Sequence, residues 1–183
     1  MNANLLSTVW PRSQRLHKAA LVGLGVVLLA ISSKVQVPFW PVPMTLQTLV
    51  VLMIGTTSGA RLAGATLVSY LAAGAVGLPV FASGMGLAYM AGPTGGYLAG
   101  FLLAAVFTGY LADKGYGCSI LSALALFAIG EIAIFALGTG WLAVLFGTEK
   151  AIAGGLLPFI PAEVLKMALG TAILSLAWKQ ARG

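Results

Sequence analysis

The chain has 183 residues, of which 60% are hydrophobic and only 8% are charged. Charged residues make up about a quarter of an ordinary soluble domain, so this composition indicates an integral membrane protein and excludes a soluble fold. The net charge of +6 is spread over loops, and it predicts membrane orientation rather than binding to nucleic acid.

Apolar segments predict six membrane helices in a single domain that covers residues 1–183. A spanning helix needs about 20 mostly apolar residues. The expected helices are 17–35, 44–57, 62–82, 94–112, 116–139 and 156–178, of which 44–57 is short. The basic residues before the first run resemble a signal peptide, but the rest of the chain is polytopic, so we interpret this run as the first helix. The predicted fold class is an all-α bundle of six transmembrane helices with both termini on one side.

The distribution of Lys and Arg places both termini in the cytoplasm. In this topology seven basic residues lie inside, namely Arg12, Arg15, Lys18, Arg61, Lys114, Lys179 and Arg182. Two lie outside, Lys34 and Lys150, while Lys166 falls within a helix and is not counted. This asymmetry agrees with the positive-inside rule.

Three loops then share the outer face, at 36–43, 83–93 and 140–157. They are longer and richer in glycine, proline and aromatic residues than the inner turns. Three prolines between Val37 and Pro43 force an extended loop. Irregular backbone near a membrane is tolerated where protein covers it or where it lines a cavity. We therefore expect irregular outer loops that cap a ligand pocket.

Two charges open the last helix. Pro161 is a natural first-turn residue, Glu163 then lies where the helix dipole favours an anion, and Lys166 follows on the same face. Charge at membrane depth is costly, so such residues are candidates for function. The alternatives are a structural ion pair, or a Lys166 side chain that reaches to the membrane surface.

Glu131 and Gln47 are further polar residues inside predicted helices. Lys166 and Glu131 lie about 7 to 8 Å and about 12 Å from the outer ends of their helices, at 1.5 Å per residue. We therefore expect Glu131 to pair or share a network with Lys166, or else to be protonated and neutral. For Gln47, composition alone favours a bond to a neighbouring helix slightly over a ligand contact.

The outer stretch Tyr89–Tyr97 combines a Gly-Pro turn with a glycine pair at a helix start. Glycines and free amide groups there can receive an anion or a carbonyl group, and Thr94 stands at this point. Tight helix packing is an equally probable use of the glycines, and the tyrosines could be interfacial aromatics. The P-loop pattern is absent, so the chain shows no means of binding ATP.

These features together resemble the BioY family, the biotin-specific S components of energy-coupling-factor (ECF) transporters. The resemblance rests on the outer loop with Val37-Pro38-Phe39-Trp40-Pro41-Val42-Pro43, followed by Met44-Thr45-Leu46-Gln47-Thr48-Leu49. It continues through Gly77-Leu78-Pro79-Val80-Phe81, Gly92-Pro93-Thr94-Gly95-Gly96-Tyr97 and Pro158-Phe159-Ile160-Pro161. The order is that of the family from about residue 35 to the C-terminus.

The resemblance implies high-affinity capture of biotin near the outer face of a bacterial cytoplasmic membrane. The family's ligand-contacting acid and lysine correspond to Glu163 and Lys166, although the family usually has Gly-Asp where this chain has Ala162-Glu163. An apolar ring of biotin would suit Phe39, Trp40 or Tyr89. The candidate ligand-binding residues are therefore Glu163, Lys166, Tyr89, Gln47, Trp40, Phe39, Thr94 and Glu131.

The resemblance also implies partners in the membrane. Family members work with a transmembrane coupling protein and a pair of ATPases, and small residues of the first helix make that contact. Here Ala19-x-x-x-Gly23 has a spacing that lets helices approach closely. No cofactor is expected.

Two other functions remain open from the sequence. The chain could capture another vitamin, such as riboflavin or thiamine. An intramembrane enzyme built on Glu131, Glu163 and Lys166 is less favoured, because no Ser/His/Asp set, paired-carboxylate motif or metal-ligand spacing is visible. We therefore expect a binding protein that is not an enzyme.

Overall fold

A computed structural model describes residues 4–9 and 15–182, so Arg12 lies outside the described residues. The long helices are α2 (Arg15–Lys34), α3 (Gln47–Ala75), α5 (Gly95–Asp113), α6 (Ile120–Phe146) and α8 (Ile160–Arg182). All five are long and apolar enough to cross a membrane. The expected all-helical membrane architecture is therefore confirmed in this respect.

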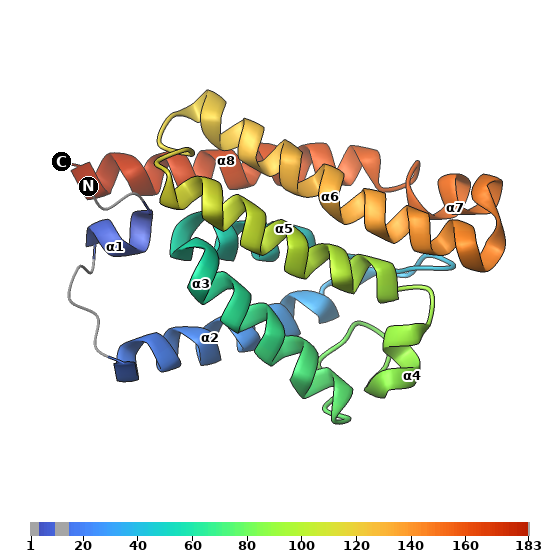
Figure 1. Cartoon of the computed structure of the whole chain (residues 1–183). Helices are drawn as coiled ribbons and strands as arrows, with labels where there is room; N and C mark the ends of the chain where they lie inside the picture. The colour runs from blue at the N-terminus through green and yellow to red at the C-terminus, as the bar shows by residue number, and fades with distance from the viewer. Residues whose placement is uncertain (1–3, 10–14, 183) are drawn as a thin grey trace.

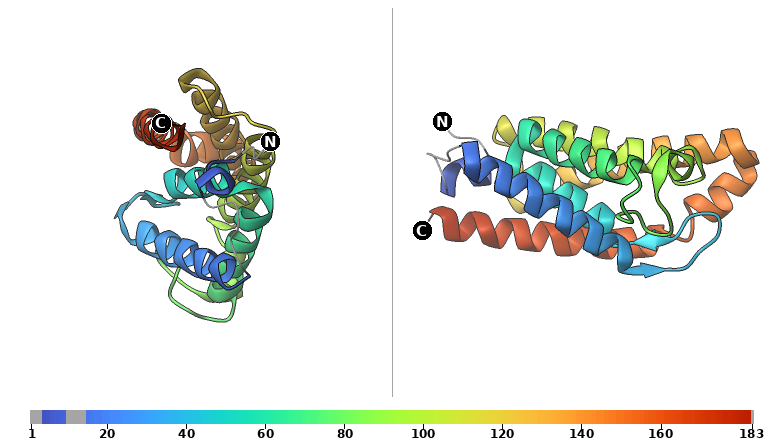
Figure 2. Two further views of the ribbon diagram at one scale, coloured as in Figure 1. Left: turned by 90° about the vertical axis from the view of Figure 1, so that its left-hand side faces the viewer. Right: turned by 90° about the horizontal axis from the view of Figure 1, so that it is seen from below.

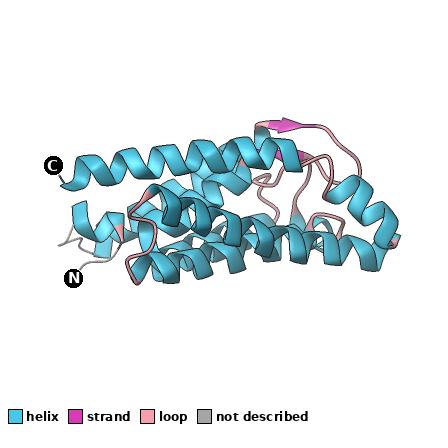
Figure 3. Cartoon of the chain, turned by 90° about the horizontal axis from the view of Figure 1, so that it is seen from above, coloured by secondary structure: helices cyan, strands magenta, loops and turns pink. Residues whose placement is uncertain are grey.

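Shorter elements lie at the two ends of the bundle (Figure 1). Helix α1 (Leu5–Val9) contacts α3 and α8 at the end where α8 finishes. The opposite end carries α4 (Gly86–Ala91), α7 (Thr148–Gly155) and an antiparallel pair of two-residue strands. In that pair β1 (Gln36–Val37) meets β2 (Met44–Thr45), and Figure 3 shows the strands beside the start of α8. We call these the α1 end and the loop end.

Helix α3 is a hairpin of two helical halves. Gly59 interrupts it with φ of 79° and ψ of 168°, a left-handed φ that favours glycine. The Gln47 amide nitrogen lies 2.7 Å from the Tyr70 hydroxyl, whereas 23 residues of continuous helix would separate these positions by about 34 Å. The halves must therefore fold back on each other, as Figure 2 also shows.

The Asp113 carboxylate stabilises this reversal. Its Oδ2 accepts a hydrogen bond from the Ala60 backbone amide at 3.0 Å, which satisfies a donor freed where the second half of α3 begins. Its Oδ1 accepts from the Asn4 side chain at 2.6 Å, which ties the residue before α1 to the same point. One side chain at the end of α5 thus joins α3, α5 and the N-terminal segment.

The core contains one continuous set of buried apolar side chains between the long helices. The largest fully buried members include Tyr70, Phe81 and Phe127. Helices α5 and α6 approach closely at Gly100, where the missing side chain leaves room for the backbone of Ile134. A Cβ at Gly100 would lie only 2.8 Å from the Cα of Ile134, so only glycine fits. Many large apolar side chains of α2 and α8 are exposed, as expected for a surface that faces lipid.

Several helix ends differ from the predicted ones. The helix expected over 62–82 ends at Ala75, because Gly77 takes φ of 99° and Pro79 follows. The helix expected over 116–139 continues to Phe146. The outer region expected as loop from 140 to 157 then contains α7, which begins immediately after Gly147. The longer α6 and the additional α7 extend the helical part of the loop end.

Candidate ligand-binding site

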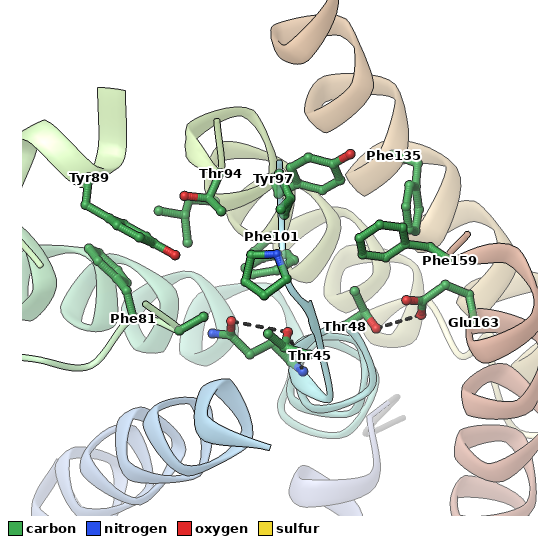
Figure 4. Close-up of a pocket in the computed structure, with 15 residues that line it drawn as sticks. Thr45, Thr48, Phe81, Tyr89, Thr94, Tyr97, Phe101, Phe135, Phe159 and Glu163 are labelled. Atoms are coloured by element: carbon green, nitrogen blue, oxygen red, sulfur yellow. Dashed lines mark hydrogen bonds between the residues drawn. The ribbon is translucent and has the colours of Figure 1, made fainter. Parts of the chain in front are cut away.

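A pocket lies between the long helices at the loop end. It holds about 470 Å³ of space, including the part open to solvent. Its lining is mostly apolar or aromatic with a few polar side chains, a composition typical of small-molecule sites. The lining residues are Val42, Pro43, Thr45, Gln47, Thr48, Phe81, Ala82, Tyr89, Thr94, Tyr97, Leu98, Phe101, Phe135, Phe159 and Glu163. Figure 4 shows these side chains around a common space.

Aromatic rings stand on two sides of this pocket (Figure 4). Phe135 of α6 and Phe159, just before α8, form an edge-on pair with centroids 5.7 Å apart, and Tyr97 of α5 lies 5.8 Å from Phe135. Phe81 and Tyr89 stack on the other side at 5.2 Å. Such walls suit a flat or ring-shaped apolar ligand.

The charged part of the site is a closed set of three side chains. Lys166 Nζ donates to Glu163 Oε1 at 2.7 Å and to Thr48 Oγ1 at 2.9 Å, and the Thr48 hydroxyl donates to Glu163 Oε2 at 2.7 Å. Lys166 also donates to the backbone oxygen of Thr45 at 2.7 Å. All four residues come from the start of α8 or from β2 and the start of α3.

This arrangement determines which polar atoms remain for a ligand. An ammonium group has three donors, and the three bonds of Lys166 use them all. An ionised carboxylate has about four acceptor positions, of which Glu163 uses two. Glu163 lines the pocket and Lys166 lies behind it, so the site offers hydrogen-bond acceptors to a ligand that carries N–H or O–H groups.

Gln47 lines the pocket and also helps to hold the segment that carries Phe81. Its amide donates to Tyr70, whose hydroxyl donates to the Val80 backbone oxygen at 3.0 Å. Lys34 donates to the backbone oxygen of Phe81, the next residue, at 2.5 Å. These bonds hold the segment that carries Phe81 against α2 and α3.

The structure brings together some of the predicted site residues. Glu163, Gln47, Tyr89 and Thr94 line the pocket. Lys166 supports it through Glu163, as described above.

Two predicted aromatic residues lie elsewhere. Trp40 is 73% exposed and packs against Phe146 of α6, with ring centroids 5.7 Å apart. Phe39 lines an adjoining groove together with Tyr89 and Thr94, and its ring lies 6.4 Å from that of Phe159. Neither side chain is among those that line the pocket itself.

The expected direct ion pair between Glu131 and Lys166 is wrong. Lys166 spends its three donors on Glu163, Thr48 and Thr45, and among the described residues neither oxygen of Glu131 has a hydrogen-bond partner. Glu131 is buried in α6 and does not line the pocket. The alternative form of this prediction, a shared network, agrees better with the structure, because Glu163 and Lys166 both interact with Glu131.

Several residues that line the pocket were not predicted from the sequence as site residues. Phe101 and Phe135 lie within long apolar runs, where nothing distinguishes a pocket wall from a core or lipid-facing side chain. Thr48 and Phe159 lie within the stretches that carry the family resemblance, which was a signal that could have selected them. Thr48 is the more important omission, because it bridges the two charges.

The described residues contain no group of three or more His, Cys, Asp or Glu side chains that could hold a metal ion.

Known proteins resemble this chain along most of its length. The model of the BioY family matches residues 3–183. A probable biotin transporter BioY from Pyrococcus horikoshii is 36% identical over 159 residues, which cover 85% of this chain and 93% of the relative. A biotin transporter BioY from Rhizobium etli is 35% identical over 169 residues, with 85% and 90% covered.

A solved structure has the same fold. It is the crystal structure at 2.1 Å of the S-component for biotin from an ECF-type ABC transporter, with a TM-score of 0.77 over 91% of this chain and 93% of that chain. At 24% sequence identity this likeness shows the fold alone. The family match and the curated relatives, taken with it, show that the chain belongs to the BioY family.

Proposed function

We propose that this chain captures biotin at the pocket beside Glu163 and serves in its uptake as the S component of an ECF transporter. The observation that carries the proposal is the Glu163 carboxylate, which is held by Lys166 and Thr48 and faces an aromatic pocket. Biotin offers ureido N–H donors, an apolar fused ring and a carboxylate tail. Relatives that are 34 to 36% identical carry the name biotin transporter.

The free acceptors of Glu163 suggest how biotin lies in the pocket. Its ureido N–H groups would donate to Glu163, since Lys166 has no donor left for a ligand. The fused ring would then lie among Phe101, Phe135 and Phe159. The carboxylate tail would point toward Thr94 and the adjoining groove, which shares Tyr89 and Thr94 with the pocket.

For the membrane topology we propose six segments, with the two halves of α3 counted separately and the α1 end in the cytoplasm. The reversal at Gly59 supports this count. Arg15 and Lys179 lie at the α1 end of their helices, whereas Lys34 lies at the loop end of α2. This distribution supports the proposal of a multi-pass protein in the cytoplasmic membrane with its pocket open to the outside.

A coupling protein and ATPase subunits are proposed as partners. Ala19 and Gly23 of α2 are exposed, and a Cβ added at Gly23 would meet no atom within 4 Å. This open strip of small residues would let a partner helix approach α2 closely. ATP hydrolysis would then take place on another chain.

Competition binding tests the ligand. Labelled biotin is bound to the detergent-purified chain and challenged with excess unlabelled biotin, riboflavin or thiamine. The proposal requires displacement by biotin alone. Displacement by riboflavin or thiamine, or stabilisation of the chain by either without biotin, would assign the pocket to another vitamin.

A further inference from the structure

Glu131 is a buried carboxyl group that lies close enough to the Glu163 carboxyl to interact with it. Its residue is 6% exposed, and no donor among the described residues reaches either of its oxygens. An ionised carboxylate is strongly disfavoured in such a place unless a cation or several donors accompany it. The exposed Glu149 of α7 has no such constraint.

Among the described residues, the charges that act on Glu131 come from α8. Glu163 and Lys166 are these charges, and Lys166 already pairs with Glu163 at 2.7 Å. Within the described chain, α3 and α5 carry one charged side chain each, Arg61 and Asp113, and both lie toward the α1 end, at the turn of α3 and the end of α5. The charged side chains of α7, Glu149 and Lys150, are exposed. The cluster thus contains two carboxyl groups and a single cation.

Charge balance decides the state of this cluster. Lys166 and Glu163 neutralise each other, so an ionised Glu131 would leave one uncompensated negative charge in the protein interior. Two carboxylates that share a site do not both ionise readily. We propose that Glu131 is a proton-binding site whose occupancy links ligand capture at Glu163 to pH.

The link to capture rests on the proposed function. When the proton leaves Glu131 for bulk water, its carboxylate competes with Glu163 and Thr48 for Lys166 and disturbs the acceptor that faces the pocket. The added negative charge also repels the ligand's carboxylate. Protonated Glu131 therefore favours capture, and affinity falls as rising pH removes the proton.

Infrared spectroscopy of the purified chain tests the proton site without any ligand. The carbonyl stretch of a protonated carboxylic acid is expected at neutral pH in the parent and in Glu149→Gln, and it should be absent in Glu131→Gln. Alkaline pH should remove it from the parent. A neutral-pH spectrum with no band that depends on Glu131 would overturn the proposal. If the glutamine variant does not fold, Glu131→Met provides the same comparison.

Biotin affinity as a function of pH tests the link. Between about pH 6 and about pH 9 the parent and Glu149→Gln are expected to lose affinity by about tenfold or more. In Glu131→Gln the ratio of the two affinities should stay near one. An equal ratio in the parent and Glu131→Gln would overturn the link. If the folded parent binds no biotin at any pH, the proposed function fails, while the infrared result still decides the proton site.

Discussion

Glu163 and Lys166 are joined by an ion pair of 2.7 Å, and the lysine has no donor left for any other group. The two residues therefore have different roles, although they lie one turn apart on the same helix. Glu163 faces the pocket and accepts hydrogen bonds, and Lys166 holds its carboxylate in position. This division of roles leads to the first two predictions.

Replacing Glu163 by Gln should weaken biotin binding by about 10- to 100-fold. Gln keeps the shape, but it removes a charged acceptor and presents an amide donor to the ureido N–H groups; hydrogen bonds to charged groups contribute about 1.5–3 kcal/mol. Glu163→Asp retains the charge and the acceptors, so its loss should be smaller. Calorimetry on the three purified proteins measures the order, and an affinity for Glu163→Gln equal to that of the parent would contradict it.

Replacing Lys166 by Met should lower thermal stability even without ligand. The change leaves Glu163 as a buried carboxylate without its cation, and breaking a buried pair in this way costs about 3–5 kcal/mol. The double variant Lys166→Met with Glu163→Gln should be less destabilised than the sum of the two single variants. Melting temperatures of the four proteins in detergent measure this coupling. Strict additivity would mean that the pair contributes nothing.

The aromatic wall can be tested with two phenylalanines on one helix. Phe101 of α5 is buried at the pocket, whereas Phe107 is 44% exposed on the outside of the bundle. Phe101→Ala should lower biotin affinity by about tenfold or more, because a buried aromatic contact is lost. Phe107→Ala should leave the affinity unchanged. Equal effects would indicate a general loss of folding instead of a local contact.

The turn at Gly59 gives a prediction about folding. Gly59→Ala combines an unfavourable φ of 79° with a Cβ that would collide with Asp113 and Asn4. Gly77→Ala is the matched control, because its φ is 99° but no atom lies within 4 Å of the added Cβ. Both variants should lose about 1–2 kcal/mol from backbone strain. Thermal melts should show a distinctly larger loss for Gly59→Ala, and equal melting temperatures would argue against a close-packed turn.

The sequence predicted much of the fold because membrane helices depend on long apolar runs. The runs that contain Ala19 and Met167, for example, were long enough to identify the first and last helices. Helix ends are harder to predict, since Gly77 and Pro79 allow α3 to end at Ala75 but do not fix the residue, and α6 continues past Gly138 and Gly140 to Phe146. These ends depend on turn geometry at Gly77 and Gly147, whose left-handed φ values a glycine permits but does not require.

The candidate site was predicted in part. Its location followed from the family resemblance and from charges at the start of α8, and four predicted residues line the pocket. The hydrogen bonds did not follow, because Thr48 lies 115 residues from Glu163 and only the packing of α3 on α8 brings them together. Trp40 looked suitable on chemical grounds, yet aromatic character alone does not tell a pocket wall from a ring packed on Phe146.

Calorimetric titration of biotin into the purified chain, without ATPase subunits, tests the central claim most directly. A second titration with a biotin analogue whose ureido nitrogens are blocked tests the role of Glu163. The account predicts about one biotin per chain and much weaker binding of the blocked analogue. No binding of biotin by a well-folded parent would contradict the function, and equal binding of both compounds would contradict the proposed contact with Glu163.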